Sequence, residues 1–569
     1  MGLAAEIPSA PTEDLERKVE RLRENATRFA REPLVKKLGW LYQIRERLAR
    51  ASERWVNATC RHVRIDPSSP VAGEAWILGP IATLRVLRLL SAALADIQRF
   101  GAPQLPGKAR QLDNGQTAVK VFPSALSDHG LLPGVQAEVR LQPGPGGEPV
   151  RQAGFYQQKE PQGRVAVVLG AGNVSSIPAL DALNKLFIEG QVVILKLNPV
   201  NEYVGPIFED VFKPLIDQGY LAIVYGGADV GSALCSHPLV DEILITGSDR
   251  THDAIVWGSD KVERERRRAL NQPLLTKPIT SELGNITPVV VVPGPYSDAE
   301  LNAMAESIAG MVTQNASFNC VSAKMLVLPR GWAGSERLLA SLAEIFSRVP
   351  TRYAYYPGAR ERYQVLTRDA GHVMAFGRPG EGELPWTVIR GLNPSDKSCL
   401  HFRMEPFCSI LSVVELDEAE PGAFLLAATT FCNDTLWGTL NAMLFVPPAR
   451  LDDEGFEYEV ETAVRQLGYG VVAVNQWSAV AYAAGTTPWG GHPSATLRDV
   501  QSGIGWVHNT FMLEGIEKCV VRGPLTSPFR PVWSPLHRTC HLVGRELCAF
   551  EASPDIWRLS KLGYHALRG

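Results

Sequence analysis

The amino-acid sequence predicts an α/β protein with a doubly wound parallel sheet. Between residues 163 and 246, short apolar strands alternate with loops and helices, and a second series of strands and helices runs from about 286 to 475. Strands separated by helices pair in parallel, because each connection has to cross over the sheet. Apolar residues at helical spacing over 13–60 and 71–100 predict that helices precede both series.

The first series contains four expected strands, at residues 164–169, 192–196, 221–225 and 242–245. Each is a continuous apolar run, which is typical of strands buried on both faces. Parallel sheets of this kind bind ligands beyond the carboxyl ends of their strands. We therefore expect the polar and glycine residues that follow these strands to line a ligand site.

Residues 134–160 predict a β-hairpin just before the first parallel strand. Val135–Leu141 alternates polar and apolar residues, Pro143–Gly147 is typical of a turn, and 150–158 is again extended. Residues 525–569 are rich in Pro, Trp and His, and we expect them to form an irregular tail.

Composition and charge limit the class of protein. The chain has 57 Lys and Arg against 60 Asp and Glu, a net charge of -3, so no nucleic-acid partner is expected. The N-terminus lacks the apolar core of a signal peptide, and no apolar run approaches the ~18 residues that span a bilayer, so we expect no integral membrane segment. The nine cysteines form no Cys-x-x-Cys pair and no Cys/His cluster with zinc spacing, which indicates reduced thiols, no metal and a cytoplasmic protein.

Cys320 is the candidate nucleophile. A lone cysteine is more often a small core residue, but Cys320 follows a polar segment, Gln314–Asn319, in a loop that leads into a strand. Catalytic residues concentrate in such loops. The reactive form is the thiolate, which backbone N–H groups or the nearby Lys324 can stabilise.

Glu282 and Asn173 are candidates for the same site. The Leu-Gly pair directly after Glu282 indicates a tight turn whose backbone approaches another group closely; without that signal, Glu282 reads as a surface carboxylate at a strand end. Asn173 follows the first parallel strand, where it lines the ligand crevice, caps the next helix, or does both.

Three further segments suit a nucleotide. Lys196 closes a buried strand and needs a partner, such as a ribose hydroxyl, a phosphate or a structural carboxylate. Gly247 and Ser248 follow the fourth strand, where a strand-to-helix turn can hold a phosphate on backbone N–H groups. Glu405 and Phe407 lie in a Glu-Pro-Phe segment, in which Glu405 alone is an ordinary loop acid.

The order and separation of these segments resemble the aldehyde dehydrogenase superfamily over about residues 105–520. The series is Asn173, Lys196, Thr246–Ser248, Glu282-Leu-Gly, Cys320, Glu405-Pro-Phe407 and Pro488-Trp-Gly-Gly491, with Glu282 preceding Cys320 by 38 positions. The resemblance implies a Rossmann-type parallel-sheet cofactor domain, an α/β catalytic domain and a β-hairpin arm through which subunits form a homodimer or homotetramer. It divides the chain into an N-terminal helical region (1–104), a cofactor domain (105–278), a catalytic domain (279–474), a C-terminal return segment with an oligomerisation arm (475–524) and the irregular tail (525–569).

The same resemblance implies a role for each residue. Cys320 attacks an aldehyde substrate, Asn173 holds the developing oxyanion, and Glu282 activates water. NAD or NADP is the implied cofactor, and the residues implied to bind it are Lys196, Gly247, Ser248, Glu405 and Phe407. The implied reaction is oxidation of an aldehyde to a carboxylic acid through a cysteine thiohemiacetal and thioester.

Departures from the family pattern leave alternatives open. Ser317-Phe-Asn319 stands where a Gly-Gln is usual, Met325 replaces a common Arg, and Pro199 replaces an acid beyond the cofactor-binding lysine. Without a carboxylate at position 199, we expect NADP to be accepted as well as NAD. Two other functions fit the sequence: an enzyme that passes the acyl group to or from coenzyme A, and a catalytically silent nucleotide-binding protein on the same fold.

Overall fold

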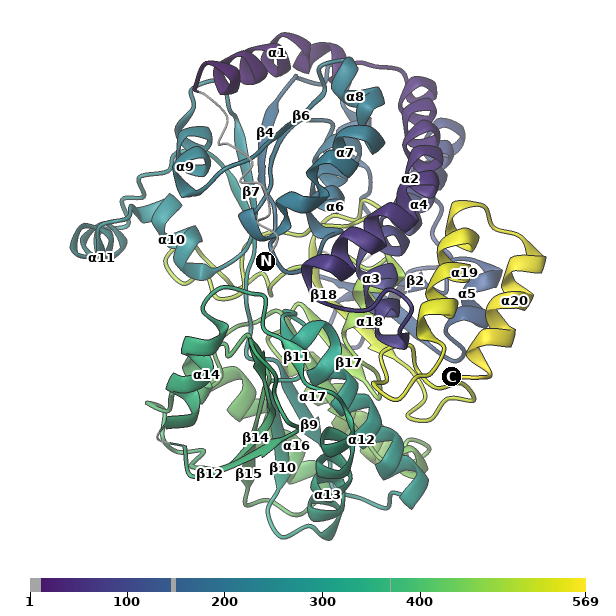
Figure 1. The fold of residues 1–569 in the computed structure, drawn as a ribbon, viewed down its shortest axis with the longest axis vertical. Coiled ribbons are helices and arrows are strands. Elements are labelled where there is room, and N and C mark those ends of the chain that lie inside the picture. Colours follow the sequence, from purple (N-terminus) through teal and green to yellow (C-terminus); the bar gives the residue numbers. More distant parts are fainter. Residues whose placement is uncertain (1–11, 145–149, 369) are drawn as a thin grey trace.

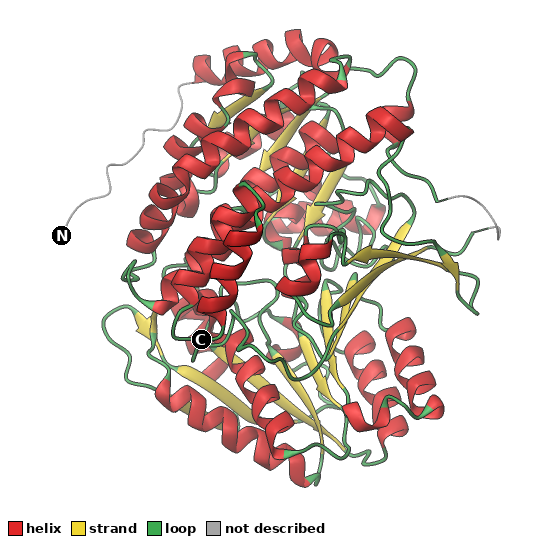
Figure 2. Cartoon of the chain, turned by 90° about the vertical axis from the view of Figure 1, so that its right-hand side faces the viewer, coloured by secondary structure: helices red, strands yellow, loops and turns green. Residues whose placement is uncertain are grey.

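The computed structural model describes residues 12–144, 150–368 and 370–569. These residues form a five-stranded sheet, in the upper part of Figure 1, and an 11-stranded sheet, in the lower part. Helices pack around the strands of both sheets (Figure 2). The expected α/β fold is therefore confirmed.

The five-stranded sheet is entirely parallel, in the order β6-β5-β4-β7-β8. Every residue of its first four strands in the chain is buried, which explains their continuous apolar runs. We expected the catalytic domain to begin at residue 279, but residues 279–282 pair with the preceding strand and extend this sheet. The strands are β4 (Val165–Leu169), β5 (Val192–Lys196), β6 (Leu221–Val224), β7 (Glu242–Thr246) and β8 (Ile279–Glu282).

Helices connect the strands of this sheet. They are α6 (Ile177–Leu183), α7 (Gly205–Val211), α8 (Lys213–Asp217), α9 (Ala228–Ser236), α10 (Asp249–Trp257) and α11 (Lys261–Leu270). The N-terminal helices α1 (Thr12–Ala30), α2 (Leu34–His62) and α4 (Ala82–Phe100) form where the helical spacing of apolar residues predicts them. α1 packs against β4, β5 and β6, and α2 packs against α4.

The stretch Pro70–Phe100 joins short helical turns, among them α3 (Gly73–Trp76), to α4. By length and composition it is apolar enough to cross a membrane, contrary to our expectation that no such run exists. However, 72% of its most apolar window is buried inside the protein. Leu84, Leu87 and Leu90 are all fully buried, so packing in the core accounts for the apolar character of this helix.

The 11-stranded sheet runs in the order β1-β2-β3-β18-β17-β16-β9-β10-β15-β14-β12. Its parallel strands are β9 (Pro288–Val291), β10 (Met325–Pro329), β14 (Trp386–Leu392), β15 (Ile410–Leu416), β16 (Asn441–Phe445), β17 (Val471–Val474) and β18 (Ile516–Arg522). Antiparallel strands flank them, namely β12 (His372–Phe376) at one end and β1 (Arg110–Gln111), β2 (Thr117–Phe122) and β3 (Gln136–Leu141) at the other. The associated helices are α12 (Asp298–Thr313), α13 (Ala333–Arg348), α14 (Ala359–Arg368), α16 (Pro421–Asp434), α17 (Glu454–Gln466) and α18 (Ala479–Ala484).

The hairpin that we expected at 134–160 does not form. β3 occupies its first half, but residues 150–158 contain one isolated bridge and a short 3-10 turn instead of a strand. The turn residues 145–149 lie outside the described residues. β3 pairs instead with β2 on one side and β18 on the other. Alternation correctly marked β3 as a strand, but local periodicity does not reveal which strands it pairs with, and one of them, β18, is distant in the sequence.

The expected irregular tail contains two helices, α19 (Cys540–Ala552) and α20 (Ile556–Ala566). They lie on the right of Figure 1, beside α5 (Leu126–Leu131). Glu551 of α19 is buried and pairs with Arg85 (3.0 Å) and Arg88 (2.7 Å) of α4. The prediction of an irregular tail is therefore wrong for these two helices: α19 packs against the distant α4, and α20 packs against α19.

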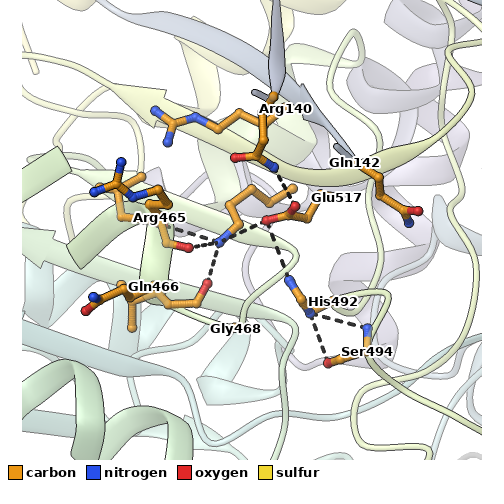
Figure 3. A network of polar contacts seen from close by, with 12 residues as sticks. Arg140, Gln142, Arg465, Gln466, Gly468, His492, Ser494 and Glu517 are labelled. Carbon is orange, nitrogen blue, oxygen red and sulfur yellow. Dashed lines mark hydrogen bonds and ion pairs between the residues drawn. The ribbon is translucent and has the colours of Figure 1, made fainter. Parts of the chain in front are cut away.

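A polar network ties β18 to α17 (Figure 3). Lys518 Nζ donates hydrogen bonds to the carbonyl oxygens of Arg465 (2.9 Å) and Leu467 (2.6 Å), at the C-terminus of α17. The neighbouring Glu517 accepts a hydrogen bond from Gln116 (2.5 Å). A lysine in this position satisfies carbonyl groups that have no partner within the helix. The network thus holds the last parallel strand of the large sheet in place.

Candidate active site

A cavity of about 1160 Å³ lies at the carboxyl ends of β4, β5 and β7 and is also lined by loops of the large sheet. Typical small-molecule pockets span roughly 300–1,000 Å³, so this one can hold an extended ligand. All eight residues that the sequence singled out line this cavity: Asn173, Lys196, Gly247, Ser248, Glu282, Cys320, Glu405 and Phe407.

Cys320 lies in the turn between the 3-10 segment Gln314–Ser317 and β10, partly exposed to the cavity. Its carbonyl oxygen accepts hydrogen bonds from Thr287 Oγ1 (3.0 Å), Asn441 Nδ2 (3.2 Å) and Lys324 Nζ (3.4 Å). Three donors on one carbonyl fix the backbone at this residue. The backbone N–H of Cys320 has no hydrogen-bond partner among the described residues, so it can serve a ligand.

The segment before Cys320 has an unusual backbone. Asn315, Ala316 and Ser317 have φ angles of 52°, 52° and 71°, a region that residues with a Cβ rarely adopt. The side-chain amide of Asn315 donates to the carbonyl oxygens of Phe318 (3.1 Å) and Asn173 (3.0 Å), which stabilises this conformation. Strained backbone persists only where the surroundings hold it, and it concentrates at functional sites.

The Cys320 thiol lies beside the Glu282 carboxyl group. Burial raises the pKa of the Cys320 thiol well above its ordinary value; the charges of Glu282 and Glu405 raise it further, and Lys324 lowers it. Burial also raises the pKa of Glu282 to about 8, the charge of Asp181 adds to this, and contacts with Trp489 and Cys320 lower it. Since both groups resist ionisation, they compete for one negative charge, and the thiol proton can pass to the carboxylate.

Glu282 is held by its neighbours in the small sheet. It ends β8, and its carbonyl oxygen accepts the N–H of Gly247 (3.0 Å). The N–H of Gly247 that we expected to hold a phosphate is therefore already bonded. Any side chain at Gly284 would collide with the Glu405 carboxylate. The close approach that Leu-Gly indicated is thus an approach to Glu405.

Glu405 forms a short ion pair with Lys324, which is 1% exposed. Lys324 Nζ also donates to the carbonyl oxygen of Asn285 (3.0 Å). The Glu405 carboxylate that we expected to meet a ribose is thus engaged with a lysine, although it still lines the cavity. Phe407, with φ 41°, packs its ring against those of Phe318 and Tyr356, at centroid distances of 5.9 and 4.9 Å.

Asn173 bonds to the loop that carries Cys320. Its side-chain Nδ2 donates to the Phe318 carbonyl oxygen (2.9 Å), and its own carbonyl oxygen accepts the Tyr355 hydroxyl (2.8 Å). Asn173 does not cap α6, whose N-cap residue is Ser176. An amide nitrogen carries two hydrogens, so one N–H of Asn173 stays available to a ligand.

Lys196 and Ser248 lie on the wall that the five-stranded sheet contributes. Lys196 is 8% exposed, and its Nζ has no hydrogen bond or ion pair within the described residues. Burial lowers the pKa of Lys196, whereas Glu202 and Asp229 raise it. Ser248 caps α10 by accepting the N–H of Thr251 (3.2 Å), at a helix N-terminus that favours an anion. This wall therefore offers positive charge to the cavity.

Part of the chain is similar in sequence to known aldehyde dehydrogenases. Residues 139–352 match the sequence model of the aldehyde dehydrogenase family. N-Succinylglutamate 5-semialdehyde dehydrogenase 1 of Caulobacter vibrioides is 24% identical over 306 residues, 52% of this chain and 57% of that protein. The 4-trimethylaminobutyraldehyde dehydrogenase of Homo sapiens is 29% identical over 169 residues, 28% of this chain and 29% of that protein. The matches thus span little more than half of the first relative and less of the second.

Solved structures share the fold. Glyceraldehyde-3-phosphate dehydrogenase from Methanocaldococcus jannaschii, complexed with NADP, superposes with a TM-score of 0.61 at 14% identity, covering 92% of this chain and 97% of that one. NAD-dependent aldehyde dehydrogenase from Sinorhizobium meliloti gives 0.60 at 17% identity, covering 92% and 89%. The sequence match over residues 139–352 and the shared fold together support membership of the aldehyde dehydrogenase superfamily.

The aldehyde dehydrogenase match ends at residue 352, so it includes Asn173, Glu282 and Cys320 but neither Glu405 nor Trp489. For those two positions, the cavity and the contacts around Glu282 supply the connection to the site.

Several groups at this candidate site were not singled out from sequence. Asp181 carries a usable signal, because it is a carboxylate in the otherwise apolar helix Ile177–Leu183. Trp489 belongs to the noted Pro-Trp-Gly-Gly motif, but the motif does not show that its indole lies beside Glu282. Arg362, which lines the cavity and donates to the Pro406 carbonyl oxygen (2.9 Å), has no local signal.

Proposed function

We propose that this protein oxidises an aldehyde to a carboxylic acid, with NAD or NADP as hydride acceptor and Cys320 as nucleophile. The observation that carries the proposal is the pairing of the Cys320 thiol with the Glu282 carboxyl group at the wall of a large cavity. A thiol beside a base is what covalent acyl chemistry requires. The names of the relatives, all of them aldehyde dehydrogenases, support the same reaction class.

The first step is addition of Cys320 Sγ to the aldehyde carbonyl carbon. As the carbon–sulfur bond forms, the thiol proton passes to the Glu282 carboxylate, and negative charge develops on the carbonyl oxygen. The unbonded backbone N–H of Cys320 and the remaining N–H of the Asn173 amide stabilise that oxygen. One such donor is typically worth about 3 kcal/mol in the transition state.

The cavity residues fit a nicotinamide dinucleotide. Lys196 is buried, has no partner among the residues that the structure describes, and suits ribose hydroxyls; Ser248 at the N-terminus of α10 suits a diphosphate oxygen. Gly247, Glu405 and Phe407 complete the wall. When bound, the nicotinamide supplies the acceptor for the hydride that leaves the thiohemiacetal carbon, and the acyl group then remains on Cys320 as a thioester.

Once Glu282 has released to solvent the proton that it took from the thiol, it activates water. Its carboxylate takes a proton from a water molecule whose oxygen attacks the thioester carbon; the carbon–sulfur bond breaks, and the acid and the Cys320 thiolate are released. Because the pKa of Glu282 is raised to about 8, the carboxylate form becomes predominant only above that pH. Hydrolysis is therefore expected to accelerate as the pH rises toward and past 8.

The decisive experiment is a panel of aldehydes with NAD and with NADP, with and without coenzyme A, followed by identification of the product by mass spectrometry. We expect reduced cofactor and a carboxylic acid without coenzyme A. An acyl-CoA that appears only when coenzyme A is added would identify an acyl-transferring enzyme instead. Cofactor binding without turnover of any aldehyde would identify a silent nucleotide-binding protein.

We also propose a homodimer or homotetramer in the cytoplasm. Membership of the superfamily supports self-association, and the nine cysteines, all free thiols, suit a reducing compartment. Light scattering on the purified protein tests the first proposal, and localisation of a tagged chain in its host tests the second.

A further inference from the structure

A second buried carboxylate lies behind Glu282, and the proposed mechanism does not use it. Asp181 of α6 is 0% exposed; it accepts a hydrogen bond from Thr246 Oγ1 (2.8 Å) and lies 3.1 Å from His508 Nε2. Thr246 and Glu282 are register partners in the β7–β8 pair, so their side chains project from the same face of the sheet. Asp181 therefore approaches the face from which the Glu282 side chain extends.

His508 is held in place from several sides. It has a positive φ of 58°, and its backbone N–H donates to Asn184 Oδ1 (2.9 Å). The ring of Tyr482 packs edge-on against the imidazole, with centroids 5.0 Å apart, and packs also against Trp489 at 5.7 Å. Trp489 in turn lies beside Glu282. A non-glycine residue in this conformation persists only when its surroundings over-determine it.

We propose that Asp181 and His508 form a positioning pair that sets the pH at which Glu282 gives up its proton. This inference rests on the proposed function, in which Glu282 is the base. A charged Asp181 opposes a second negative charge on Glu282, whereas a hydrogen bond from His508 Nε2 to Asp181 offsets part of that charge and relieves the opposition. Neither residue lines the cavity, so the pair acts on the base through charge and touches neither substrate nor cofactor.

The other charged groups near the pair have partners of their own. The titratable groups that face Glu282 from other elements are Cys320, Lys324, Glu405 and Tyr482. Lys324 is paired with Glu405, and burial raises the pKa of Tyr482 well above its ordinary value, so the phenol stays neutral. Lys185, which follows α6, pairs with Glu242 (2.5 Å) and Glu189 (2.7 Å). Within the part of the chain that the structure describes, His508 is thus the one group bonded to Asp181 that can carry positive charge.

The test uses two variants that each remove the contact between Asp181 and His508. One lowers the negative charge near Glu282, and the other leaves that charge less compensated. Asp181→Asn removes the negative charge and keeps the shape of the side chain, while His508→Gln leaves Asp181 charged without the imidazole that contacts it. Cys320 is first acylated with p-nitrophenyl acetate, without cofactor or aldehyde, and release of the acetyl group is then followed by mass spectrometry as a function of pH. With the thiol acylated, the pH profile of release reports Glu282 and not Cys320.

We expect the midpoint of the wild-type profile to move down by about one pH unit in Asp181→Asn and up by about one unit in His508→Gln, since a nearby charge shifts a carboxyl group by one to three units. At pH values well below the midpoint, release of the acetyl group should therefore be about tenfold faster in Asp181→Asn and about tenfold slower in His508→Gln. The double variant should behave like Asp181→Asn. Asp128→Asn, another buried carboxylate that is paired with Arg85 (2.9 Å), is the matched control and should leave the midpoint unchanged.

Unchanged midpoints with uniformly slower release would show a merely structural role and overturn the proposal, as would shifts of both variants in one direction. A shift in Asp181→Asn alone would show that His508 takes no part. A release rate that is the same in Glu282→Gln would instead refute the proposed function of Glu282, so the two failures are distinguishable. If acylation fails, a 13C NMR titration of the glutamate carboxyl groups, with Glu282→Gln to assign the signal, measures the same midpoint.

Discussion

The two walls of the cavity differ in how many of their polar groups are already bonded within the protein. On the catalytic wall, the Cys320 carbonyl oxygen receives three hydrogen bonds and Lys324 is paired with Glu405. On the wall of the five-stranded sheet, Lys196 and Arg250 have no hydrogen bond or ion pair to any described residue. Preorganised groups suit chemistry, because the geometry is in place before the reaction. Unpaired charges suit a ligand that brings its own acceptors.

This difference divides the expected effects of substitutions. Changes on the catalytic wall should alter rate constants with little effect on cofactor affinity, because the groups there are bonded to one another. Changes on the other wall should alter cofactor affinity more than the chemical step. A substitution on one wall that mainly changes the quantity expected to depend on the other wall would show that the two walls are coupled.

The largest effect is expected for Cys320→Ala, which should lower turnover by more than about 10⁴-fold, as loss of a nucleophile does elsewhere. Cofactor affinity, measured by fluorescence titration, should stay within a fewfold of wild type, because the thiol belongs to the catalytic wall. Cys399→Ala is the matched control, since Cys399 is the other partly exposed cysteine. A Cys320→Ala protein with wild-type turnover would end the proposed mechanism.

Glu282→Gln should separate the two halves of the reaction. We expect a burst of about one reduced cofactor per site, slower than in the wild type because the thiol also loses its proton acceptor. A steady state about 10²–10⁴-fold slower than in the wild type should follow, because water lacks its base. The wild-type steady-state rate should rise with pH around 8, the pKa of Glu282, and the variant should lose this dependence. Mass spectrometry should detect the acyl-enzyme; absence of both burst and acyl-enzyme would argue against hydrolysis through Glu282.

Stability gives an independent check on the same carboxyl group. Because its pKa is raised from 4.5 to about 8, the folded state retains a proton that the unfolded chain releases. The stability that this provides is complete below pH 4.5 and is lost as the pH rises through 8. Denaturant titrations at several pH values should show this loss in the wild type and a weaker dependence in Glu282→Gln.

The two walls also differ in how well the sequence predicted them. The wall of the five-stranded sheet consists of strand–loop–helix units, so Lys196 and Ser248 could be placed at strand ends from local pattern. The catalytic wall depends on contacts such as Lys324 with Glu405, 81 positions apart, which no local pattern shows. For the same reason, the partners of β3 and the two C-terminal helices were missed, because distant strands and ion pairs determine them.

A smaller effect is expected for Lys324→Met, which tests whether the buried ion pair serves the thiol. Losing the positive charge leaves Glu405 unpaired, which raises the pKa of Cys320 further. Alkylation by iodoacetamide at pH 8 should slow by about 10–100-fold. Lys324→Met/Glu405→Gln should recover part of the rate, and Lys518→Met, which removes another buried lysine, should not slow it. Equal alkylation rates in Lys324→Met and wild type would show that the pair is only structural.

The smallest expected effect concerns the wall of the five-stranded sheet and the 2′-phosphate of NADP. Pro199 opens the segment that follows β5, so no carboxylate stands at that position, three residues beyond Lys196. Glu202 does influence Lys196, but its Oε1 is bonded to the N–H of Gly226 (2.8 Å). We therefore expect the wild type to bind NADP as well as NAD.

Pro199→Asp should weaken the binding of NADP by about tenfold through charge repulsion and leave the binding of NAD nearly unchanged, whereas Pro199→Ala should affect neither. Fluorescence titrations with both cofactors measure this. If the wild type binds NAD at micromolar levels and does not bind NADP, an acid other than one at position 199 must repel the 2′-phosphate. Glu202→Gln should then allow NADP to bind, because Glu202 is an acid whose charge reaches Lys196.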